Sequence, residues 1–387
     1  MKRATMKGVA VLLAWGCAPA PDGDDDTDAV AVDTDPVPLG DPPGWVAPDA
    51  PGPYGVGVVT LTWTHPELGE LRAELWYPAT PETDAPRATY DQDILSFPSD
   101  VAVREAPPDR RGGPYPLVAF SHGFGGIRFQ SFFLTEHLAS HGFVVIAPDH
   151  PMSSLVDLRP SKAAEAAARR PGQLSAAVDL LDTAPVAGLE VDTSRFAAVG
   201  HSFGGWTSLV VGGGVVHAEA VEEVCATLDP TGCNFFEGQE LPLEEVAKHA
   251  QPDPRAQVTV ALAPGVWYAF GTEGEGLQSV RRPLVLGGTR DGDLPYAKEI
   301  LPTYEALGAG KALGSLQDAG HWAFSDLCRI LPVADCAGEA KGFMEPERTQ
   351  AITREKVLAW VRVGLLDEGR DAPWLAGAED LAWEVGE

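Results

Sequence analysis

The chain has 387 residues, and its 56 acidic and 28 basic side chains leave a formal charge of −28 at pH 7. With 44% hydrophobic residues it can bury a large core, which excludes global disorder. The pI near 4.6 argues against nucleic acid and against docking on an anionic membrane, because both need clustered Lys and Arg.

Residues 1–17 are typical of an export signal. The basic start MKRATMK precedes the apolar run GVAVLLAW, which is too short to span a bilayer permanently. Residues 13–17 are similar to a bacterial lipoprotein box, which predicts a lipid on Cys17 as the only membrane contact. Trp15 fits that box poorly, so cleavage without lipidation stays open. We expect a bacterial envelope protein, in the outer membrane or periplasm, or a secreted one.

Residues 18–51 form a predicted linker. They contain nine Asp, many Pro, and no Lys or Arg, a composition that stays extended and self-repelling. A calcium loop is the alternative, but EF-hand spacing with its closing Glu is absent. Residues 52–387 are then expected to form the folded domain.

Four further cysteines fit an exported protein. They form two pairs with seven residues between partners, Cys225 with Cys233 and Cys328 with Cys336. Local disulfides are the simple pairing, although three connectivities are possible. Zinc sites favour Cys-x-x-Cys spacing, which is missing, so we expect neither a metal nor another cofactor.

From residue 52 onward, short apolar runs alternate with amphipathic stretches. The predicted strands are 57–63, 73–78, 116–123, 143–149, 196–202, 258–264 and 283–289. The predicted helices with the clearest apolar spacing are 130–142, 173–184 and 354–366. Several strands are continuously apolar, as in sheets covered on both faces. The pattern predicts an α/β fold with a mostly parallel sheet and helices on both faces.

Residues 215–256 interrupt this alternation with a polar, partly helical segment that carries the first cysteine pair. We interpret the segment as a small cap or lid rather than a second domain. Its conformation would then help to set the volume of the binding pocket.

A predicted strand runs directly into Gly-x-Ser-x-Gly around Ser202, and a helical stretch follows. In a nucleophile elbow, glycines permit the strained turn that lifts the serine hydroxyl above the sheet. The helix N-terminus also favours developing negative charge. A glycine-rich turn that merely contains a serine is the alternative, but the flanking strand and helix favour a nucleophile.

The segment HGFGG (122–126) follows another predicted strand and can supply a second oxyanion loop. Acyl transfer needs donors where the carbonyl oxygen becomes an anion. We predict that the backbone N–H groups of Phe124 and Phe203 form this pair. An ordinary glycine-rich loop is the alternative.

The acid and the base are expected after the nucleophile, in the order Asp then His. Asp291 lies at the end of the strand 283–289, with Asp293 two residues on, and His321 is the only histidine downstream. We predict that His321 takes the proton of Ser202 and that Asp291 fixes its tautomer.

Other histidines have structural interpretations. His137 and His141 have the spacing of a metal pair, but His141-Gly142 favours a helix end, with a cationic ring at the negative pole of the dipole. His201 is expected to pack beside the nucleophile without titrating. The dipeptide Asp149-His150 precedes the nucleophile and is interpreted as structural or as part of the pocket rim.

Four aromatic residues adjoin the predicted catalytic elements in sequence: Phe124, Trp206, Trp267 and Trp322. We predict that they line an apolar pocket for the acyl group. Packing in the core is the alternative for each.

Together these residues resemble the α/β-hydrolase superfamily, and more closely the platelet-activating-factor acetylhydrolases and dienelactone-hydrolase-like bacterial esterases. The resemblance covers most of residues 52–327 and rests on GPYGVG, LWYP, YPLVAFSHGFGG, LASHGFVVIAPDH and DTSRFAAVGHSFGG. It implies an α/β-hydrolase domain at 52–387 that cleaves short-acyl lipid or phospholipid esters, such as 1-alkyl-2-acetylglycerophosphocholine, through an acyl-enzyme.

One departure weakens the phospholipid specificity. Animal acetylhydrolases carry the acid where this chain has Ala263-Pro264, so the acid must come from Asp291, as in bacterial polyester hydrolases. Dienelactone hydrolases use a Cys nucleophile, which Ser202 argues against. A cutinase-like polyester hydrolase or a lipase is the alternative. A non-catalytic envelope lipoprotein is less favoured, because all three triad residues are present.

Overall fold

In the computed structural model of the chain, the described residues are 41–386 without 82–83, 93–94, 228–235, 237–238 and 331–332. Contacts divide the chain into residues Met1–Leu39 and a large unit, Gly40–Glu387. The predicted export signal, Cys17 and the linker up to residue 40 lie outside the described residues. Within the described part, no helix is both long and apolar enough to cross a membrane.

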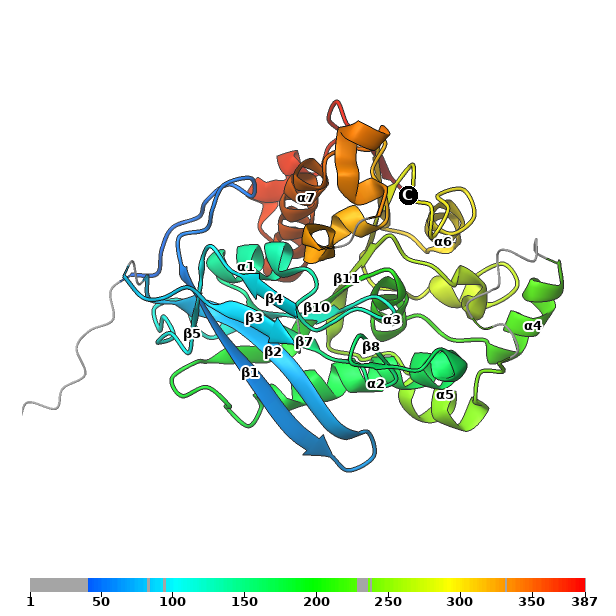
Figure 1. Cartoon of the computed structure of the whole chain (residues 1–387), viewed down its shortest axis with the longest axis horizontal. Helices are drawn as coiled ribbons and strands as arrows, with labels where there is room; N and C mark the ends of the chain where they lie inside the picture. Colours follow the sequence, from blue (N-terminus) through cyan, green and yellow to red (C-terminus); the bar gives the residue numbers. More distant parts are fainter. Residues whose placement is uncertain are drawn as a thin grey trace, which may run out of the picture. The chain divides into compact units, whose positions relative to one another are not determined.

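A ten-stranded sheet runs through the large unit in the order β14-β13-β12-β11-β10-β6-β7-β2-β1-β5 (Figure 1). Its strands are β1 (Gly55–His65), β2 (Gly69–Ala79), β5 (Ala102–Arg104), β6 (Tyr115–Ser121), β7 (Val144–Pro148), β10 (Val191–His201), β11 (Ala256–Leu262), β12 (Pro283–Gly288), β13 (Ala312–Leu316) and β14 (Leu381–Val385). The six strands from β7 to β13 in this order are parallel, whereas β2 and β14 are antiparallel to their neighbours. Two small hairpins lie outside it: β3 (Thr89–Gln92) with β4 (Leu95–Pro98), and β8 (Ser153–Ser154) with β9 (Asp157–Leu158).

Helices cover both faces of the sheet, as predicted. One pair is α1 (Phe132–Ser140) with α7 (Pro346–Leu366), and the other is α2 (Ala163–Leu181) with α3 (Phe203–Val211) (Figure 1). The remaining helices are α4 (Ala218–Thr227), α5 (Leu243–His249), α6 (Ile300–Ala306) and the 3-10 helices η1 (Pro160–Lys162), η3 (Trp267–Phe270), η4 (Glu275–Leu277), η5 (Trp322–Phe324), η6 (Asp326–Arg329), η7 (Asp335–Lys341) and η8 (Gly369–Trp374). One hydrophobic cluster of the core contains residues of α1, and another contains Leu174 of α2. In β6, Val118 and Phe120 belong to the first, and Leu117 and Ala119 belong to the second. This alternation buries the strand on both faces.

All seven predicted strands overlap observed ones, whereas α2 begins ten residues before its predicted start at 173. Pro171 lies inside this helix, where a proline removes a backbone donor and usually ends the pattern. At Gly172, an added Cβ would lie 3.2 Å from the His249 side chain, so glycine permits the close approach of α5.

The end of the predicted linker requires a correction. Residues 41–51 belong to the large unit and contact it through their backbone. Three of their carbonyl oxygens accept hydrogen bonds from side chains in α7 and in or next to α1. Arg362 donates to the Val46 carbonyl (2.9 Å), His137 to the Pro48 carbonyl (2.9 Å) and His141 to the Ala50 carbonyl (2.8 Å). Composition alone misplaced the boundary, because it does not show these specific contacts.

Helix α1 does end before Gly142, whose φ of 93° is the left-handed conformation that favours glycine. The expected cationic ring at this end is wrong. Burial lowers the pKa of His137 to about 3 and that of His141 to about 4, so both rings are neutral at pH 7. They act as hydrogen-bonding groups that hold the segment 41–51.

Part of the 215–256 segment is described. It contributes α4 and α5, and α5 is anchored to α2 by an ion pair between Glu245 and Arg169 at 2.6 Å. Its role as a cap stays a prediction. Of the two predicted disulfides, Cys328–Cys336 is confirmed. Cys233 and the side chain of Cys225 lie outside what the structure describes.

Candidate active site

Ser202 lies in a sharp turn between β10 and α3. Its φ of 58° and ψ of −122° are strained for a residue with a side chain. An added Cβ at Gly200 would collide with the Gly204 backbone, and one at Gly204 would collide with the Ser121 backbone. The two glycines of the motif are therefore what allows the elbow to form.

His321 bridges the other two predicted triad residues. Its Nε2 lies 2.9 Å from Ser202 Oγ, and its Nδ1 lies 2.7 Å from Asp291 Oδ2. Asp291 follows β12 and His321 follows β13, so both come from the carboxyl ends of neighbouring parallel strands. The second oxygen of Asp291 accepts the N–H groups of Asp293 (3.0 Å) and Leu294 (2.7 Å). Asp293 thus positions the acid through its backbone.

The electrostatics of His321 suit a general base. Burial alone lowers the pKa of this ring, but the charge of Asp291 and its hydrogen bond outweigh burial and raise the pKa above its ordinary value. Asp293 and Asp335 add to the increase. The buried imidazole can therefore take up a proton from Ser202 and hold it as an ion pair with Asp291.

The predicted oxyanion residues lie next to the nucleophile. A Cβ added to Gly123 would lie 3.3 Å from Ser202 Cβ, and the rings of Phe124 and Phe203 are 6.0 Å apart. The Gly123 carbonyl accepts hydrogen bonds from Gly126 N–H (3.1 Å) and from the His122 ring (2.7 Å). In a trans peptide the next N–H points the opposite way. The Phe124 N–H is therefore oriented by groups that hold the Gly123 carbonyl.

The predicted aromatic lining needs one correction. Trp206 is fully buried, and its ring stacks on Phe203 at 5.3 Å, so it packs in the core instead of facing a pocket. Phe124, Trp267 and Trp322 are partly buried and pack at the edge of the core.

Neighbouring residues have the structural places expected from the sequence. His201 is buried, and burial lowers its pKa well below the ordinary value. Its ring contacts the Gln130 side chain at 2.9 Å and the His321 carbonyl at 3.0 Å. Asp149 forms an ion pair with Arg128 at 3.0 Å. The end of β11 is followed by Ala263-Pro264, so no carboxylate stands at the end of this strand.

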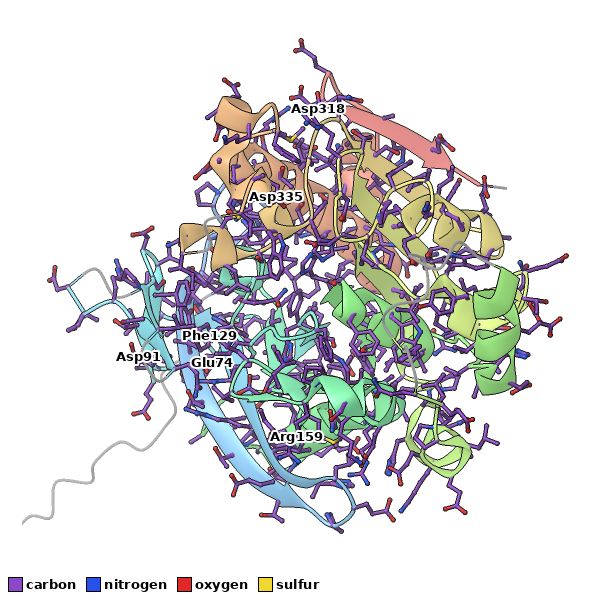
Figure 2. The ribbon with its side chains drawn as sticks, turned by 45° about the vertical axis from the view of Figure 1, so that its right-hand side comes forward. Glu74, Asp91, Phe129, Arg159, Asp318 and Asp335 are labelled. Carbon is purple, nitrogen blue, oxygen red and sulfur yellow. A yellow bond between two sulfur atoms is a disulfide. The ribbon has the colours of Figure 1, made fainter. Side chains whose placement is uncertain are left out.

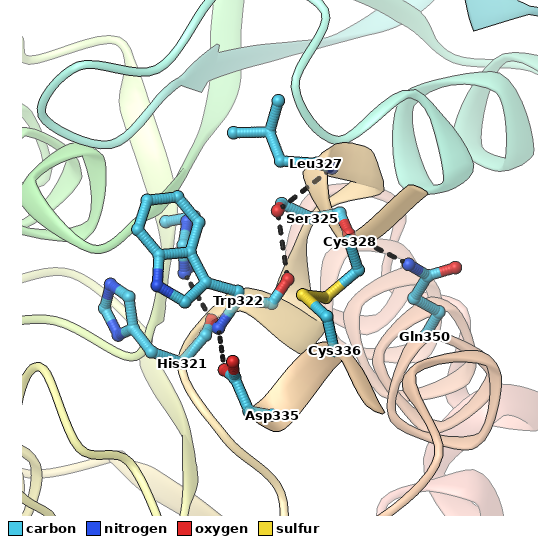
Figure 3. Close-up of a disulfide and its surroundings, with 9 residues drawn as sticks. His321, Trp322, Ser325, Leu327, Cys328, Asp335, Cys336 and Gln350 are labelled. Atoms are coloured by element: carbon cyan, nitrogen blue, oxygen red, sulfur yellow. Dashed lines mark hydrogen bonds between the residues drawn. A yellow bond between two sulfur atoms is a disulfide. The ribbon is translucent and has the colours of Figure 1, made fainter. Parts of the chain in front are cut away.

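Sequence reasoning missed Asp335, which supports the loop of His321. Its carboxylate accepts the Trp322 N–H at 2.6 Å (Figure 3). Gly320 packs so closely that a Cβ there would collide with the Asp335 side chain. The adjacent residue, Cys336, forms the disulfide with Cys328. The cysteine pairing was the only signal in the sequence near this carboxylate.

A cavity of 680 Å³ lies elsewhere, and no triad residue lines it. Its walls come from residues 49–56, from α1 and from α7, and include Glu136 and Arg354. We therefore assign the candidate active site from the geometry of Ser202 and His321 and not from this cavity.

The solved structure of a ferulic acid esterase from Streptomyces cinnamoneus aligns with 83% of this chain and 93% of its own, with a TM-score of 0.55 and 24% identity. The chain has the α/β-hydrolase fold. This result confirms the predicted fold class.

Similarity in sequence is more local. A family model described as Chlorophyllase matches residues 87–239 of this chain. The cutinase est2 of Thermobifida alba is 37% identical over 102 residues, which are 26% of this chain and 31% of the relative. Cutinase 2 of Thermobifida cellulosilytica is 36% identical over 102 residues, 26% of this chain and 35% of the relative. The chain spans about a third of the length of these curated relatives.

Proposed function

We propose that this protein, with its α/β-hydrolase fold, is an exported serine esterase that cleaves carboxylic esters. The observation that carries the proposal is the position of His321 between Ser202 Oγ, at 2.9 Å, and Asp291 Oδ2, at 2.7 Å. The raised pKa of His321 supports the same assignment, because a general base must be able to hold the transferred proton.

The geometry supports an acyl-enzyme mechanism. Ser202 Oγ attacks the ester carbonyl while His321 Nε2 takes its proton, and Asp291 stabilises the imidazolium. The N–H groups of Phe124 and Phe203 bind the oxyanion of the tetrahedral intermediate. His321 then donates its proton to the leaving alcohol. Water, deprotonated by His321, then attacks the acyl-Ser202 ester, and His321 returns this proton to Ser202 Oγ as the acid is released.

The surface beside the oxyanion loop supports an apolar substrate. The β8–β9 hairpin joins that loop through hydrogen bonds from Gly125 N–H to Ser153 O (2.8 Å) and from Leu155 N–H to Gly126 O (2.7 Å). On this hairpin, Leu155 and Leu158 are each 42% exposed. Burial of such side chains by an acyl chain or polymer is favourable.

Two substrate classes follow. Short-acyl lipid or phospholipid esters are the first, from the resemblance to acetylhydrolases. The similarity to the Thermobifida cutinases favours polyesters as the second. Export with a lipid on Cys17 or as a secreted protein suits either class, since both substrates occur outside the cytoplasm.

Hydrolysis of p-nitrophenyl esters from acetyl to palmitoyl tests the proposal on wild type and Ser202→Ala. We expect activity that disappears in Ser202→Ala, with a maximum at acetyl or butyryl for a short-acyl esterase. A maximum at long chains would indicate a lipase. No activity on any ester, in folded and oxidised wild type, would contradict the esterase and favour a binding protein.

A polyester film separates the two substrate classes. If a polyester is the substrate, Leu155→Ser should lower the release of acid from the film more than it lowers the hydrolysis of p-nitrophenyl acetate. An equal effect on both substrates would argue against docking of a polymer on the β8–β9 hairpin.

A further inference from the structure

Arg170 is a fully buried cation in α2 without a carboxylate partner among the described residues. Its guanidinium donates to neutral oxygens only, those of Thr207 (3.1 Å), Ser153 (2.9 Å), Ser121 (3.1 Å) and the His122 carbonyl. Burial lowers the pKa of Arg170, but a guanidinium remains protonated in proteins. A buried charge without a counter-ion is costly, so this arrangement needs a reason.

Arg128 shows that the same fold can neutralise a buried arginine. Its guanidinium pairs with Glu74 at 2.9 Å and with Asp149 at 3.0 Å, and both Arg128 and Glu74 are fully buried. In Figure 2, Glu74 is labelled beside Phe129, whose ring lies 4.9 Å from the Arg128 guanidinium carbon. The missing carboxylate is therefore a specific feature of Arg170.

One set of contacts leads from Arg170 to the oxyanion loop. Arg170 donates to the carbonyl of His122, and to Ser121 Oγ, which donates to the ring of His150 at 2.9 Å. The His150 N–H donates to His122 Nε2 at 3.1 Å, and His122 Nδ1–H donates to the Gly123 carbonyl at 2.7 Å. That carbonyl fixes the direction of the next N–H in the loop.

A second set of contacts leads to the nucleophile helix. Thr207 Oγ1, which accepts from Arg170, donates to the carbonyl of Phe203 at 3.0 Å. The guanidinium carbon lies 4.8 Å from the centre of the Phe203 ring. The cation therefore holds the first turn of α3 against the oxyanion loop.

His122 must be neutral, because its Nε2 accepts the hydrogen bond of the His150 N–H. His150 Nδ1 lies 2.9 Å from Gln173 Oε1, and a neutral ring with its proton on Nδ1 leaves Nε2 to accept from Ser121 Oγ. Burial lowers the pKa of both rings well below the ordinary value, and the Arg170 charge lowers it further. Arg170 thus remains the charged group beneath the loop.

We propose that Arg170 is a positioning residue for the oxyanion, and that its unneutralised positive charge stabilises the tetrahedral intermediate through Phe124 and Phe203. This inference rests on the proposed esterase function. In a site that excludes water, a fixed charge aimed at developing negative charge acts strongly and requires no reorganisation. A carboxylate beside Arg170 would cancel that field. The protein therefore keeps the buried guanidinium without a counter-ion, although this lowers its stability.

The sharpest test supplies the missing counter-ion. Ser153→Asp places a carboxylate beside the Arg170 guanidinium, and Ser153→Asn is the matched neutral control of the same size. We expect kcat on p-nitrophenyl butyrate to be about 10- to 100-fold lower in Ser153→Asp than in Ser153→Asn, with KM within about threefold, because removing an oxyanion donor itself costs ~10²–10³. Affinity for a boronic acid, which forms a tetrahedral anion on Ser202, should fall in the same proportion.

Direct substitutions provide the second test. We expect Arg170→Met to lower kcat by about 10- to 100-fold. Arg170→Lys should have a higher kcat than Arg170→Met, because it restores a positive charge. If Ser153→Asp and Ser153→Asn have equal kcat and equal boronate affinity, the proposal is wrong. A folded Arg170→Met with wild-type kcat also overturns it. Both results leave the esterase assignment intact, because that assignment depends on the activity of wild type and its loss in Ser202→Ala.

Discussion

Two groups of histidines in this molecule have pKa values shifted in opposite directions, although burial lowers the pKa in both. His321 follows β13, whereas His137 and His141 lie at the end of α1. Burial lowers the pKa of the α1 histidines to about 3 and about 4. The Asp291 carboxylate outweighs burial at His321 and raises the pKa there. A carboxylate partner, and not burial, decides whether a histidine can act as a base or only as a neutral hydrogen-bonding group.

The largest expected effect comes from removing that carboxylate. Asp291→Asn should lower kcat/KM on p-nitrophenyl esters by roughly 10⁴-fold, because the ring of His321 loses its tautomer and its counter-charge. Asp293→Asn is the matched control, since Asp293 contacts Asp291 through its backbone N–H. We expect kcat/KM of Asp293→Asn to fall by less than about threefold. Equal losses in the two variants would contradict the triad assignment.

The disulfide is expected to matter more for the His321 loop than for the end of α1. The double variant Cys328→Ala, Cys336→Ala should lower the free energy of unfolding by about 2–3 kcal/mol, because the bridge closes a short loop in the unfolded chain. Urea unfolding measures this loss. Proteolysis of the folded variant should find new cleavage near Asp335 and unchanged protection of α1. Unchanged protection at both places would show that the bridge does not hold the His321 loop.

The lowered pKa of His137 in α1 should make the free energy of unfolding depend on pH. The unfolded chain binds protons at His137 near pH 6.5, whereas the folded chain binds them only near its pKa of about 3. The unfolded state therefore takes up more protons as pH falls below about 6.5, and stability is lost.

At pH 5 this histidine should cost about 2 kcal/mol relative to pH 7.5. His137→Gln removes the titrating group and should make the fall in urea midpoint between these pH values smaller. The same fall in wild type and variant would show that His137 titrates normally in the folded protein.

The smallest expected effect concerns the contribution of Asp335 to the raised pKa of His321. Its ring must be neutral to accept a proton, so kcat/KM falls as pH drops through its raised pKa. Asp335→Asn removes a negative charge that raises this pKa but keeps an oxygen for the Trp322 N–H. The acid limb of the profile should shift down by a few tenths of a pH unit. No shift, or an upward shift, would exclude an electrostatic role for Asp335.

The sheet and the elbow could be predicted because their signals are local. Short apolar or β-branched runs, several of them continuous, indicated the seven strands, and Gly-x-Ser-x-Gly needs only its own glycines to form the turn. His321 followed from chain order, since it is the only histidine after Asp291. The structure brings all three side chains of the predicted triad within hydrogen-bond distance.

The remainder depends on tertiary contacts that no local pattern records. Asp335 and Arg170 act through residues distant in sequence, such as Trp322 and Thr207. Trp206 was assigned to the pocket from its closeness to the nucleophile in sequence, but one turn of α3 carries its ring into the core. The charge of His141 was misjudged for the same reason, because burial appears only in the fold.

Labelling with a fluorophosphonate tests the central claim most directly, because the reagent phosphonylates only a serine activated by its base. Mass spectrometry of wild type should show one adduct per chain, on the peptide that contains Ser202. Ser202→Ala should show none, and Asp291→Asn should react far more slowly. Rapid labelling of another residue, or no labelling of folded wild type, would contradict a triad of Ser202, His321 and Asp291.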